Sequence, residues 1–362
     1  MLIMTDALTL DPQGPVLLVG GYGTVGAELA RLLSPRFPLL LTGRSRERGR
    51  EVAAETGAAL QVWDLAGTAP CRAAVRAVVG VVNDPDDRVL RAAVAGGVPY
   101  VDITRWTSRM QRAATVAALL GPTAPVLLSS AWMGGVTSLV AAQLAASLGG
   151  ADVVEVAVRW DLADRAGADS VEFMDRLGLD YEVVEAGRRR TIMPLSDVRR
   201  VRIGDRVTRV ARIDTPEQFT LPLTLGTATA TTRIGFSSGA STSALLAAKR
   251  LGLFRWGRGD RFTPMRRALL YAPGAGGTAS LRIDVTHAGR TGGAVVTDPA
   301  GQAHLTAVGA LLGVHRVLGL DGAPVRAGVQ FPEQTPTPDK VTPMLAEYGV
   351  SVEPDADIGQ VA

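Results

Sequence analysis

Short apolar runs alternate with helical periods from residue 16 to about residue 130. The runs lie at 16–19, 39–42, 60–64, 78–83, 100–103 and 126–129. Between them, the spacing of apolar positions predicts helices at 25–33, 46–56, 86–95 and 109–120. Strands that are buried on both faces read as continuous runs of Val, Ile and Leu, and these runs do. The pattern therefore predicts an α/β fold with a doubly wound parallel sheet.

After Gly150 the pattern changes to alternating apolar and polar positions. Alternation and paired strand signals occur at 153–160, 198–212 and 280–297, while 220–246 is rich in Thr, Ser and Gly with Arg233 as its one charge. Alternating faces predict an antiparallel or mixed sheet with one side covered, and hence a second, α+β domain. A helical pattern returns at 303–318, followed by a Pro-rich stretch at 324–343 and a short helix at 344–348.

Composition and charge narrow the class of protein. With 362 residues, 47% of them hydrophobic, the chain can bury a core for about two domains. The formal net charge of +3 is too small to indicate binding to nucleic acid or an anionic membrane. All but two of the 38 basic residues are arginines, so any single arginine is weak evidence for a site.

Few residues of the chain could form a disulfide or a metal site. The one cysteine, Cys71, excludes a disulfide framework and every Cys-based metal site. His287, His304 and His315 lack the HExxH spacing of a zinc hydrolase, so we expect no metal. The N-terminus lacks a basic region followed by an apolar core, and the uncharged stretch after residue 113 is interrupted by Pro and Gly. We therefore expect a soluble, cytoplasmic protein.

A glycine motif follows the first predicted strand and opens the first predicted helix. Residues 16–26 read VLLVGGYGTVG, with the GxGxxG pattern at Gly21, Gly23 and Gly26. These glycines permit a tight turn, a close approach of backbone to a pyrophosphate, and close packing of helix on strand. The helix N-terminus adds free N–H groups. The motif predicts a Rossmann-type dinucleotide site, in which Tyr22, Thr24 and Val25 also contact the cofactor.

The end of the second strand indicates which dinucleotide binds. NAD-binding proteins place an acidic residue there to hold the ribose 2′-hydroxyl. Here the sequence is Leu40 to Arg46 without a carboxylate, and it contains Arg44 and Ser45. A cation and a hydroxyl suit a 2′-phosphate, so we expect NADP(H) rather than NAD(H). The alternative is that Arg44 is one more surface arginine.

Polar residues also end the next three strands. Ligands in open α/β sheets lie outside the carboxyl ends of the strands. Asp64 is placed to meet the adenine edge or to cap a helix, and both interpretations stay open. We expect Asn83, Asp84 and Asp102 to face nicotinamide and substrate, although Asp84 is also suited to an N-cap.

Together these segments resemble saccharopine dehydrogenase-like reductases. The resemblance is carried by residues 16–26, 43–45 and 81–102, and more weakly by 131–135 and by the GVQFPE at 328–333. It implies a dinucleotide-binding domain at 1–130, an inserted substrate-binding and dimerisation domain at 131–300, and a C-terminal segment at 301–362 that returns to the first. It also implies a homodimer, and hydride transfer between NAD(P)H and an imine or amino-acid-type carbon of a small molecule.

The resemblance places individual residues as well. Asn83 and Asp84 fall where that family borders nicotinamide and substrate, Thr104 on its second cofactor-edge loop, and Trp132 on the loop that crosses to the substrate domain. The chain departs from the family where Asn83 is followed by Asp-Pro-Asp. No motif for gripping a substrate carboxylate aligns in the inserted domain, where Arg159 and Arg233 are only weak candidates.

Reduction of a ketone or enone requires a proton donor, whereas a preformed iminium needs much less help. The candidates by position are Asp102, Tyr100 and Asp84, and each needs a pKa shifted by burial. The alternative is that Asp102 caps and Tyr100 packs in the core. Two other functions stay open: a reductase of a C=C or C=O electrophile on the same scaffold, and a non-catalytic NADP-binding sensor or scaffold.

Overall fold

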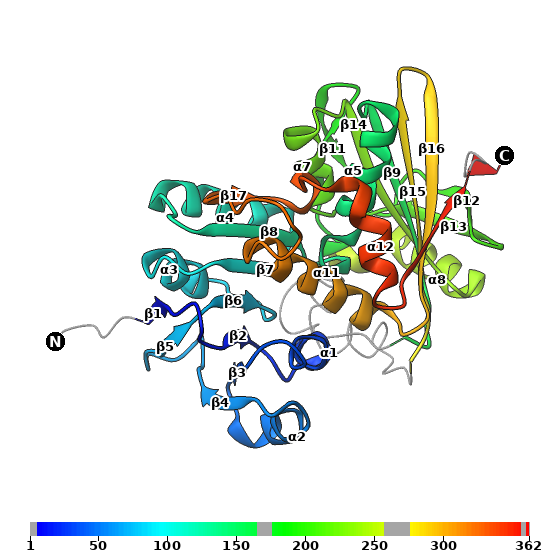
Figure 1. The fold of residues 1–362 in the computed structure, drawn as a ribbon. Helices are drawn as coiled ribbons and strands as arrows, with labels where there is room; N and C mark the ends of the chain where they lie inside the picture. Colours follow the sequence, from blue (N-terminus) through cyan, green and yellow to red (C-terminus); the bar gives the residue numbers. More distant parts are fainter. Residues whose placement is uncertain (1–5, 165–175, 257–275, 356–359, 362) are drawn as a thin grey trace. The chain divides into compact units, whose positions relative to one another are not determined.

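The computed structural model describes residues 6–164, 176–256, 276–355 and 360–361 (Figure 1). The chain divides into two compact units. The first consists of residues 1–135 and 306–337, and the second of residues 136–305 and 338–362. Each unit has its own large sheet.

The first unit is built on a seven-stranded sheet in the order β17-β8-β7-β6-β2-β3-β4, and every neighbouring pair is parallel. Its strands are β2 (Val16–Val19), β3 (Leu39–Gly43), β4 (Ala59–Val62), β6 (Ala77–Gly80), β7 (Tyr100–Arg105), β8 (Pro125–Ser130) and β17 (Gly328–Gln330). The predicted doubly wound sheet is confirmed. Because the chain moves outward from β2 to β4 and then returns to β6 on the other side of β2, the strand order reverses between β2 and β6.

Helices connect these strands as the spacing of apolar residues predicts. They are α1 (Thr24–Leu33), α2 (Arg46–Thr56), α3 (Arg88–Ala95), α4 (Thr107–Leu120) and α11 (Gln302–Val317), of which α11 starts in the second unit. In Figure 1, α1 and α2 lie beside the strands β2 to β4, while α3 and α4 lie beside the strands β6 to β8. Each of the four has a buried stripe, such as Leu29, Ala30 and Leu33 of α1.

Two short strands of the first unit were not predicted. β1 (Ala7–Leu10) and β5 (Arg72–Val75) pair in parallel as a separate two-stranded sheet. Their burial patterns are mixed rather than alternating, so the sequence carries no clear strand signal there. The third and fourth predicted strands also end earlier than expected, at Val62 and Gly80, which places Asp64 and Asn83 in loops.

The second unit is built on an eight-stranded mixed sheet in the order β18-β16-β15-β9-β14-β13-β12-β19. Its strands are β9 (Val153–Trp160), β12 (Arg199–Ile203), β13 (Arg206–Arg212), β14 (Thr229–Phe236), β15 (Ala279–His287), β16 (Arg290–Asp298), β18 (Ser351–Asp355) and β19 (Gln360–Val361). Only β9 and β14 pair in parallel. The predicted mixed sheet is confirmed.

The described helices of this unit include α5 (Val136–Leu148), α7 (Glu217–Thr224), α8 (Gly239–Arg250), α9 (Leu253–Trp256) and α12 (Val341–Ala346), and a hairpin is formed by β10 (Tyr181–Glu185) and β11 (Arg188–Ile192). The sheet curls, because β13 pairs with β14 at two residues only and β12 then contacts β9 and β15. A buried apolar cluster lies on the inner side: Ala157, Val201, Ile203, Val210 and Val295. Within the stretch 220–246, the buried part is chiefly β14, which lies between β9 and β13, while many residues on either side of it are exposed or half-buried.

The division of the chain differs from the expected domain boundaries. Residues 131–135 belong to the first unit, and only residues 306–337 of the C-terminal segment return to it. Residues 338–362 belong to the second unit, because β18 pairs with β16 and α12 packs against β18 and α5. The polar sequence of β18, which contains Pro354, gave no sign of this pairing.

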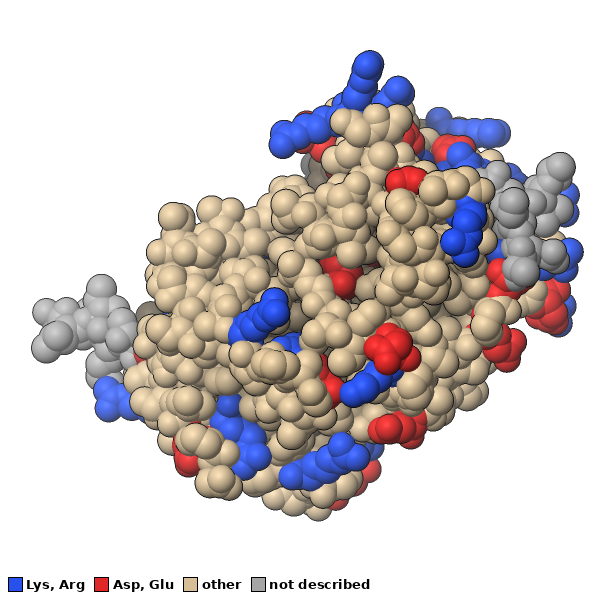
Figure 2. Space-filling view, turned by 45° about the horizontal axis from the view of Figure 1, so that its top comes forward, with Lys and Arg blue, Asp and Glu red and all other residues tan. Residues whose placement is uncertain are grey.

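The surface carries charges of both signs. Basic and acidic side chains are interspersed over much of the face drawn in Figure 2, in keeping with the small net charge. Among the described residues, no helix combines the length and the apolar character that a membrane span requires.

Candidate cofactor site

The glycine motif forms a tight elbow between β2 and α1. Gly20 has a φ of 90°, a left-handed conformation that favours glycine. The Gly23 amide donates to the carbonyl of Gly20 at 3.0 Å and closes the turn. A Cβ atom at Gly26 would lie 2.2 Å from the Gly20 carbonyl oxygen. The first turn of α1 therefore packs against the end of β2 at a distance that only glycine allows.

The elbow is open where a pyrophosphate would lie. Gly23 is exposed, and a Cβ atom there would meet only the Gly20 oxygen, at 3.4 Å. Gly23 is also the N-cap of α1 and supplies no side-chain cap. The first amides of a helix have no partner within it, so those of Thr24, Val25 and Gly26 can donate to an anion. These residues fit the diphosphate of a dinucleotide.

Basic residues gather at the start of α2. Arg44 is exposed, Ser45 is the N-cap, and Arg46 and Arg48 occupy the first turn with Glu47 as its one acid. The Ser45 hydroxyl accepts from the Arg48 amide at a long 3.4 Å. Cations at a helix N-terminus are opposed by the helix dipole, so this arrangement costs free energy until an anion binds. The turn fits a phosphate group.

Tyr22 connects the elbow to this turn. Its hydroxyl oxygen accepts the Ser45 amide at 2.8 Å. A Cβ atom at Gly43 would lie 2.2 Å from the Tyr22 Oη, and one at Gly49 would lie 2.8 Å from the ring. The structure thus brings together two predicted cofactor residues, Tyr22 and Ser45, that are 23 positions apart.

The loop after β4 folds around Arg88, a residue that the sequence did not single out. Asp64 starts this loop and accepts the Ala66 amide at 3.1 Å. Arg88 donates to the carbonyls of Asp64, Leu65, Gly67 and Ala69 and to both carboxylate oxygens of Asp6. Its guanidinium also lies over the Trp63 ring, 5.8 Å from the centroid. In an arginine-rich sequence nothing marked this residue in advance.

Asn83 and Asp84 lie in the loop between β6 and α3. Asp84 is buried and accepts the amides of Arg88 and Val89 at 3.0 and 2.8 Å, which is the capping arrangement considered from the sequence. Burial raises the pKa of the Asp84 carboxyl, against the opposing effect of these amides. The Asn83 side chain accepts from Arg109.

Asp102, Tyr100 and Thr104 form one buried network with Arg105. The Asp102 Oδ1 accepts the amide and the hydroxyl of Thr104 at 2.9 and 2.7 Å. Its Oδ2 accepts the Tyr100 hydroxyl at 2.5 Å and the Arg105 Nε at 2.7 Å. Arg105 also pairs with the buried Asp87. Burial, together with the Asp102 charge, holds the pKa of the Tyr100 phenol well above its usual value.

Trp132 starts the loop that leaves β8. Its indole is buried, with the Trp106 ring 6.3 Å away. The next three residues, Met133 to Gly135, all have positive φ values, between 56° and 91°. A left-handed methionine stores strain, and residues held in this way cluster at functional sites. Glycines 134 and 135 are required here, because added Cβ atoms would lie 2.4 Å from the Thr306 carbonyl oxygen and 2.6 Å from the Pro332 ring.

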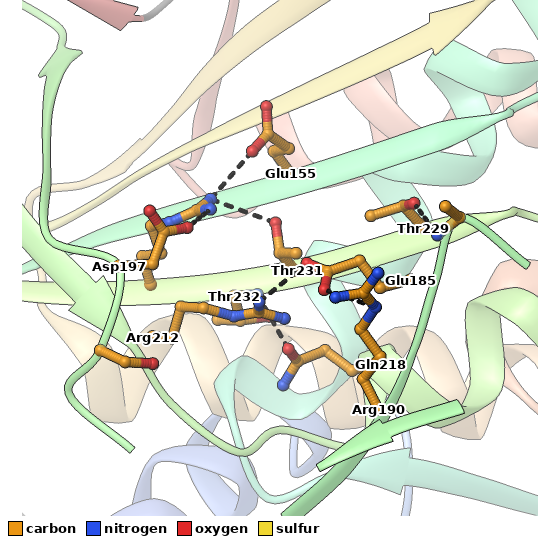
Figure 3. A network of polar contacts seen from close by, with 12 residues as sticks. Glu155, Glu185, Arg190, Asp197, Arg212, Gln218, Thr229, Thr231 and Thr232 are labelled. Atoms are coloured by element: carbon orange, nitrogen blue, oxygen red, sulfur yellow. Dashed lines mark hydrogen bonds and ion pairs between the residues drawn. The ribbon is translucent and has the colours of Figure 1, made fainter. Parts of the chain in front are cut away.

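The second unit contains a network of ion pairs around two buried arginines (Figure 3). Arg212 and Arg233 are cross-strand partners on β13 and β14, and each side chain is 4% exposed. Arg233 donates to Glu155 at 2.9 Å and to Asp197 at 2.6 Å, and Arg212 donates to Glu185 at 2.9 Å. The chain's own carboxylates thus neutralise Arg233, one of the two weak candidates for an anionic substrate group.

No protein-family model matches the chain, and no curated protein sequence matches it. Its three-dimensional structure is similar to that of apo saccharopine dehydrogenase (L-Glu forming) from Saccharomyces cerevisiae, with a TM-score of 0.64 at 11% sequence identity. The match covers 96% of this chain and 100% of the yeast chain. The fold is saccharopine dehydrogenase-like.

Other dehydrogenases match less well. Scyllo-inositol dehydrogenase from Lactobacillus casei gives a TM-score of 0.43 at 10% identity, with 94% of this chain and 99% of that chain covered. The DAP dehydrogenase of C. glutamicum gives 0.40 at 12% identity, with 92% and 96% covered. The saccharopine dehydrogenase-like fold therefore rests on the yeast structure, and at this identity the likeness concerns the fold alone.

Proposed function

We propose that the protein is an NADP(H)-dependent oxidoreductase of small molecules. The observation that carries the proposal is the glycine elbow of the first unit, joined through Tyr22 to a basic turn at the end of β3 that has no carboxylate before Glu47. The elbow lies at the carboxyl end of β2, beside the point where the strand order reverses, which is where open α/β sheets bind ligands.

In this proposal, different residues at the carboxyl ends of the strands contact different parts of the cofactor. Gly21 to Gly26 receive the pyrophosphate on the amides of α1, and Arg44 with Ser45 receives the 2′-phosphate. Asp64 lies in the loop that borders the adenine, and Asn83 lies toward the nicotinamide. The bound cofactor supplies the hydride, and the chain's task is to orient it and to exclude water.

For the reaction, we propose hydride transfer to or from an imine or amino-acid-type carbon. The fold of the yeast enzyme and the sequence resemblance support this class. Asp84, Thr104 and Trp132 are the proposed substrate contacts. Tyr100 and Asp102 are our candidates for the proton donor by position, but their burial and mutual hydrogen bond favour a positioning role. A preformed iminium, which needs little help from a protein acid, suits such a site best.

The test of the reaction is NADPH consumption by the purified protein with a panel of imines, ketones and enones. Turnover with imines alone is the expected result. Turnover with a C=C or C=O substrate would replace the imine assignment with the alternative reductase. Tight binding of NADPH without turnover across the panel would favour a non-catalytic sensor or scaffold.

The test of the cofactor is the variant Arg44→Ala. A hydrogen bond to a charged group contributes about 1.5–3 kcal/mol, so we expect NADPH affinity to fall roughly 10- to 100-fold while NADH affinity changes less than about twofold. Arg36→Ala is the matched control. Arg36 is also exposed, but it precedes the amino end of β3, whereas Arg44 follows the carboxyl end. Equal losses for both dinucleotides in Arg44→Ala would remove the NADP assignment.

A further inference from the structure

The Tyr22 hydroxyl has one hydrogen bond and one unused proton. Its oxygen accepts the Ser45 amide at 2.8 Å. Within the part of the chain that the structure describes, the hydroxyl proton has no acceptor. A phenol can accept and donate at the same time, so the group is ready to donate to a ligand at the β3–α2 turn.

The position of that hydroxyl is fixed before any ligand binds. The ring lies so close to Gly43 and Gly49 that added Cβ atoms would come within 2.2 and 2.8 Å of it. A methyl group at either position would displace the ring. Two glycines on neighbouring elements therefore make the space for Tyr22, and a ligand that uses its hydroxyl pays little conformational entropy to order it.

We propose that Tyr22 is a specificity-determining residue that donates a hydrogen bond to the 2′-phosphate of the cofactor. The inference rests on the proposed function and adds to it a residue of the glycine elbow. The Ser45 amide is already engaged by Tyr22, so the phosphate takes its hydrogen bonds from the Tyr22 and Ser45 hydroxyls, the Arg44 guanidinium and the first free amides of α2. A phosphate only accepts, and a hydrogen bond to a charged group is roughly twice as strong as one between neutral groups.

The pair of ligands 2′,5′-ADP and 5′-AMP isolates this contact, because they differ only in the 2′-phosphate. We expect the full chain to bind 2′,5′-ADP more tightly than 5′-AMP by titration calorimetry. In Tyr22→Phe, which keeps the ring, we expect about a tenfold loss for 2′,5′-ADP and less than about twofold for 5′-AMP. The urea midpoint of the ligand-free variant should match that of the unmodified chain.

Gly49→Ala provides a second test, because it keeps the Tyr22 hydroxyl in the chain but shifts its position. Its added methyl group displaces the ring, so we expect the same selective loss for 2′,5′-ADP.

The outcomes separate the two proposals. If the unmodified chain prefers 2′,5′-ADP and Tyr22→Phe keeps that preference, or loses both ligands equally, the role of Tyr22 is overturned while NADP binding stands. If the unmodified chain does not distinguish 2′,5′-ADP from 5′-AMP, the NADP assignment fails first, and the role of Tyr22 fails with it.

Discussion

At the scale of single residues, the carboxylate of Asp102 is fully engaged by hydrogen bonds within the chain. It accepts four hydrogen bonds, two on each oxygen, all from residues 100 to 105. A carboxylate has about four lone-pair positions, so none remains for a substrate. The same bonds hold the end of β7 in its conformation. We therefore expect Asp102 to contribute to function by shaping this end of the strand.

Tyr100→Phe tests how much this network stabilises the protein. Loss of the hydroxyl leaves the Asp102 carboxylate short of one donor, so we expect the free energy of unfolding at pH 7 to fall by about 1–3 kcal/mol. Tyr348→Phe is the control, because Tyr348 is half-buried and has no hydroxyl partner in the described chain. That control should change the free energy by less than about 0.5 kcal/mol. Urea unfolding measures both.

The pH dependence of the same variant follows from the raised pKa of Tyr100. An unfolded tyrosine ionises near pH 10, whereas the folded Tyr100 stays neutral well above that. Its favourable contribution is therefore complete below about pH 10 and is lost as the pH rises further, because the unfolded state gains the ionised form. The difference between Tyr100→Phe and the unmodified chain should shrink from pH 9 to pH 11. A constant difference would contradict the assigned pKa.

At the scale of elements, we expect substitutions of two glycines at the junction of β2 and α1 to affect stability and cofactor affinity differently. Gly23→Ala places a methyl group in open space where the pyrophosphate would lie, so we expect near-normal stability and a loss of NADPH affinity of tenfold or more. Gly26→Ala drives a methyl group against the Gly20 carbonyl, so we expect a loss of at least about 1–3 kcal/mol in stability as well. Circular dichroism melts and NADPH fluorescence titrations measure the two effects.

Gly239→Ala is the control for these two glycines. Gly239 begins α8 in the second unit, and an added Cβ atom there meets nothing within 4 Å. Both stability and NADPH affinity should be retained. If Gly23→Ala also retains full affinity, the elbow does not hold the diphosphate.

The elements that the sequence predicted well are those with a strong periodic signal. Strands β2 and β6 at the centre of the parallel sheet read as uninterrupted apolar runs because all their residues are buried. The spacing of apolar residues predicted α1 and α2 to within one residue. The pairing of β1 with β5 and the hairpin of β10 with β11 were missed, since half-exposed strands depend on their neighbours rather than on their own pattern.

Within the candidate site, the sequence could locate backbone features but not side-chain partners. The glycine elbow follows from local conformation, which three glycines dictate. The network around Arg105 and the loop around Arg88 depend on residues from 6 to 105 that meet only after folding. In a chain with so many arginines, composition gave no reason to choose these two.

At the scale of the whole molecule, the chain passes between its two units three times, after residues 135, 305 and 337. Of the C-terminal segment that was expected to return to the first domain, residues 306–337 lie in the first unit and residues 338–362 in the second. The sequence did not indicate this division, because a short polar edge strand such as β18 shows no apolar alternation. The homodimer and the cytoplasmic location stay predictions.

Cofactor binding to the first unit should appear in calorimetric melting of the full chain. A ligand at 100 times its Kd stabilises the folded state by about 2.7 kcal/mol, which raises the melting temperature by several degrees for a unit of this size. If the units melt separately, only one of two transitions should shift with NADPH. NADH at the same concentration should shift it less. A melting curve unchanged by NADPH would contradict the proposed site.

The guanidinium of Arg88 joins Asp6, the residue before β1, to the loop after β4, because Asp6 shares it with four backbone carbonyls of that loop. A lysine there has no planar fork with which to serve so many acceptors. Proteolytic removal of Asp6, or a fused purification tag that displaces it, would break its contact with Arg88 and loosen that loop, although none of the proposed cofactor residues is altered. Anyone preparing this protein for affinity measurements should leave its beginning undisturbed.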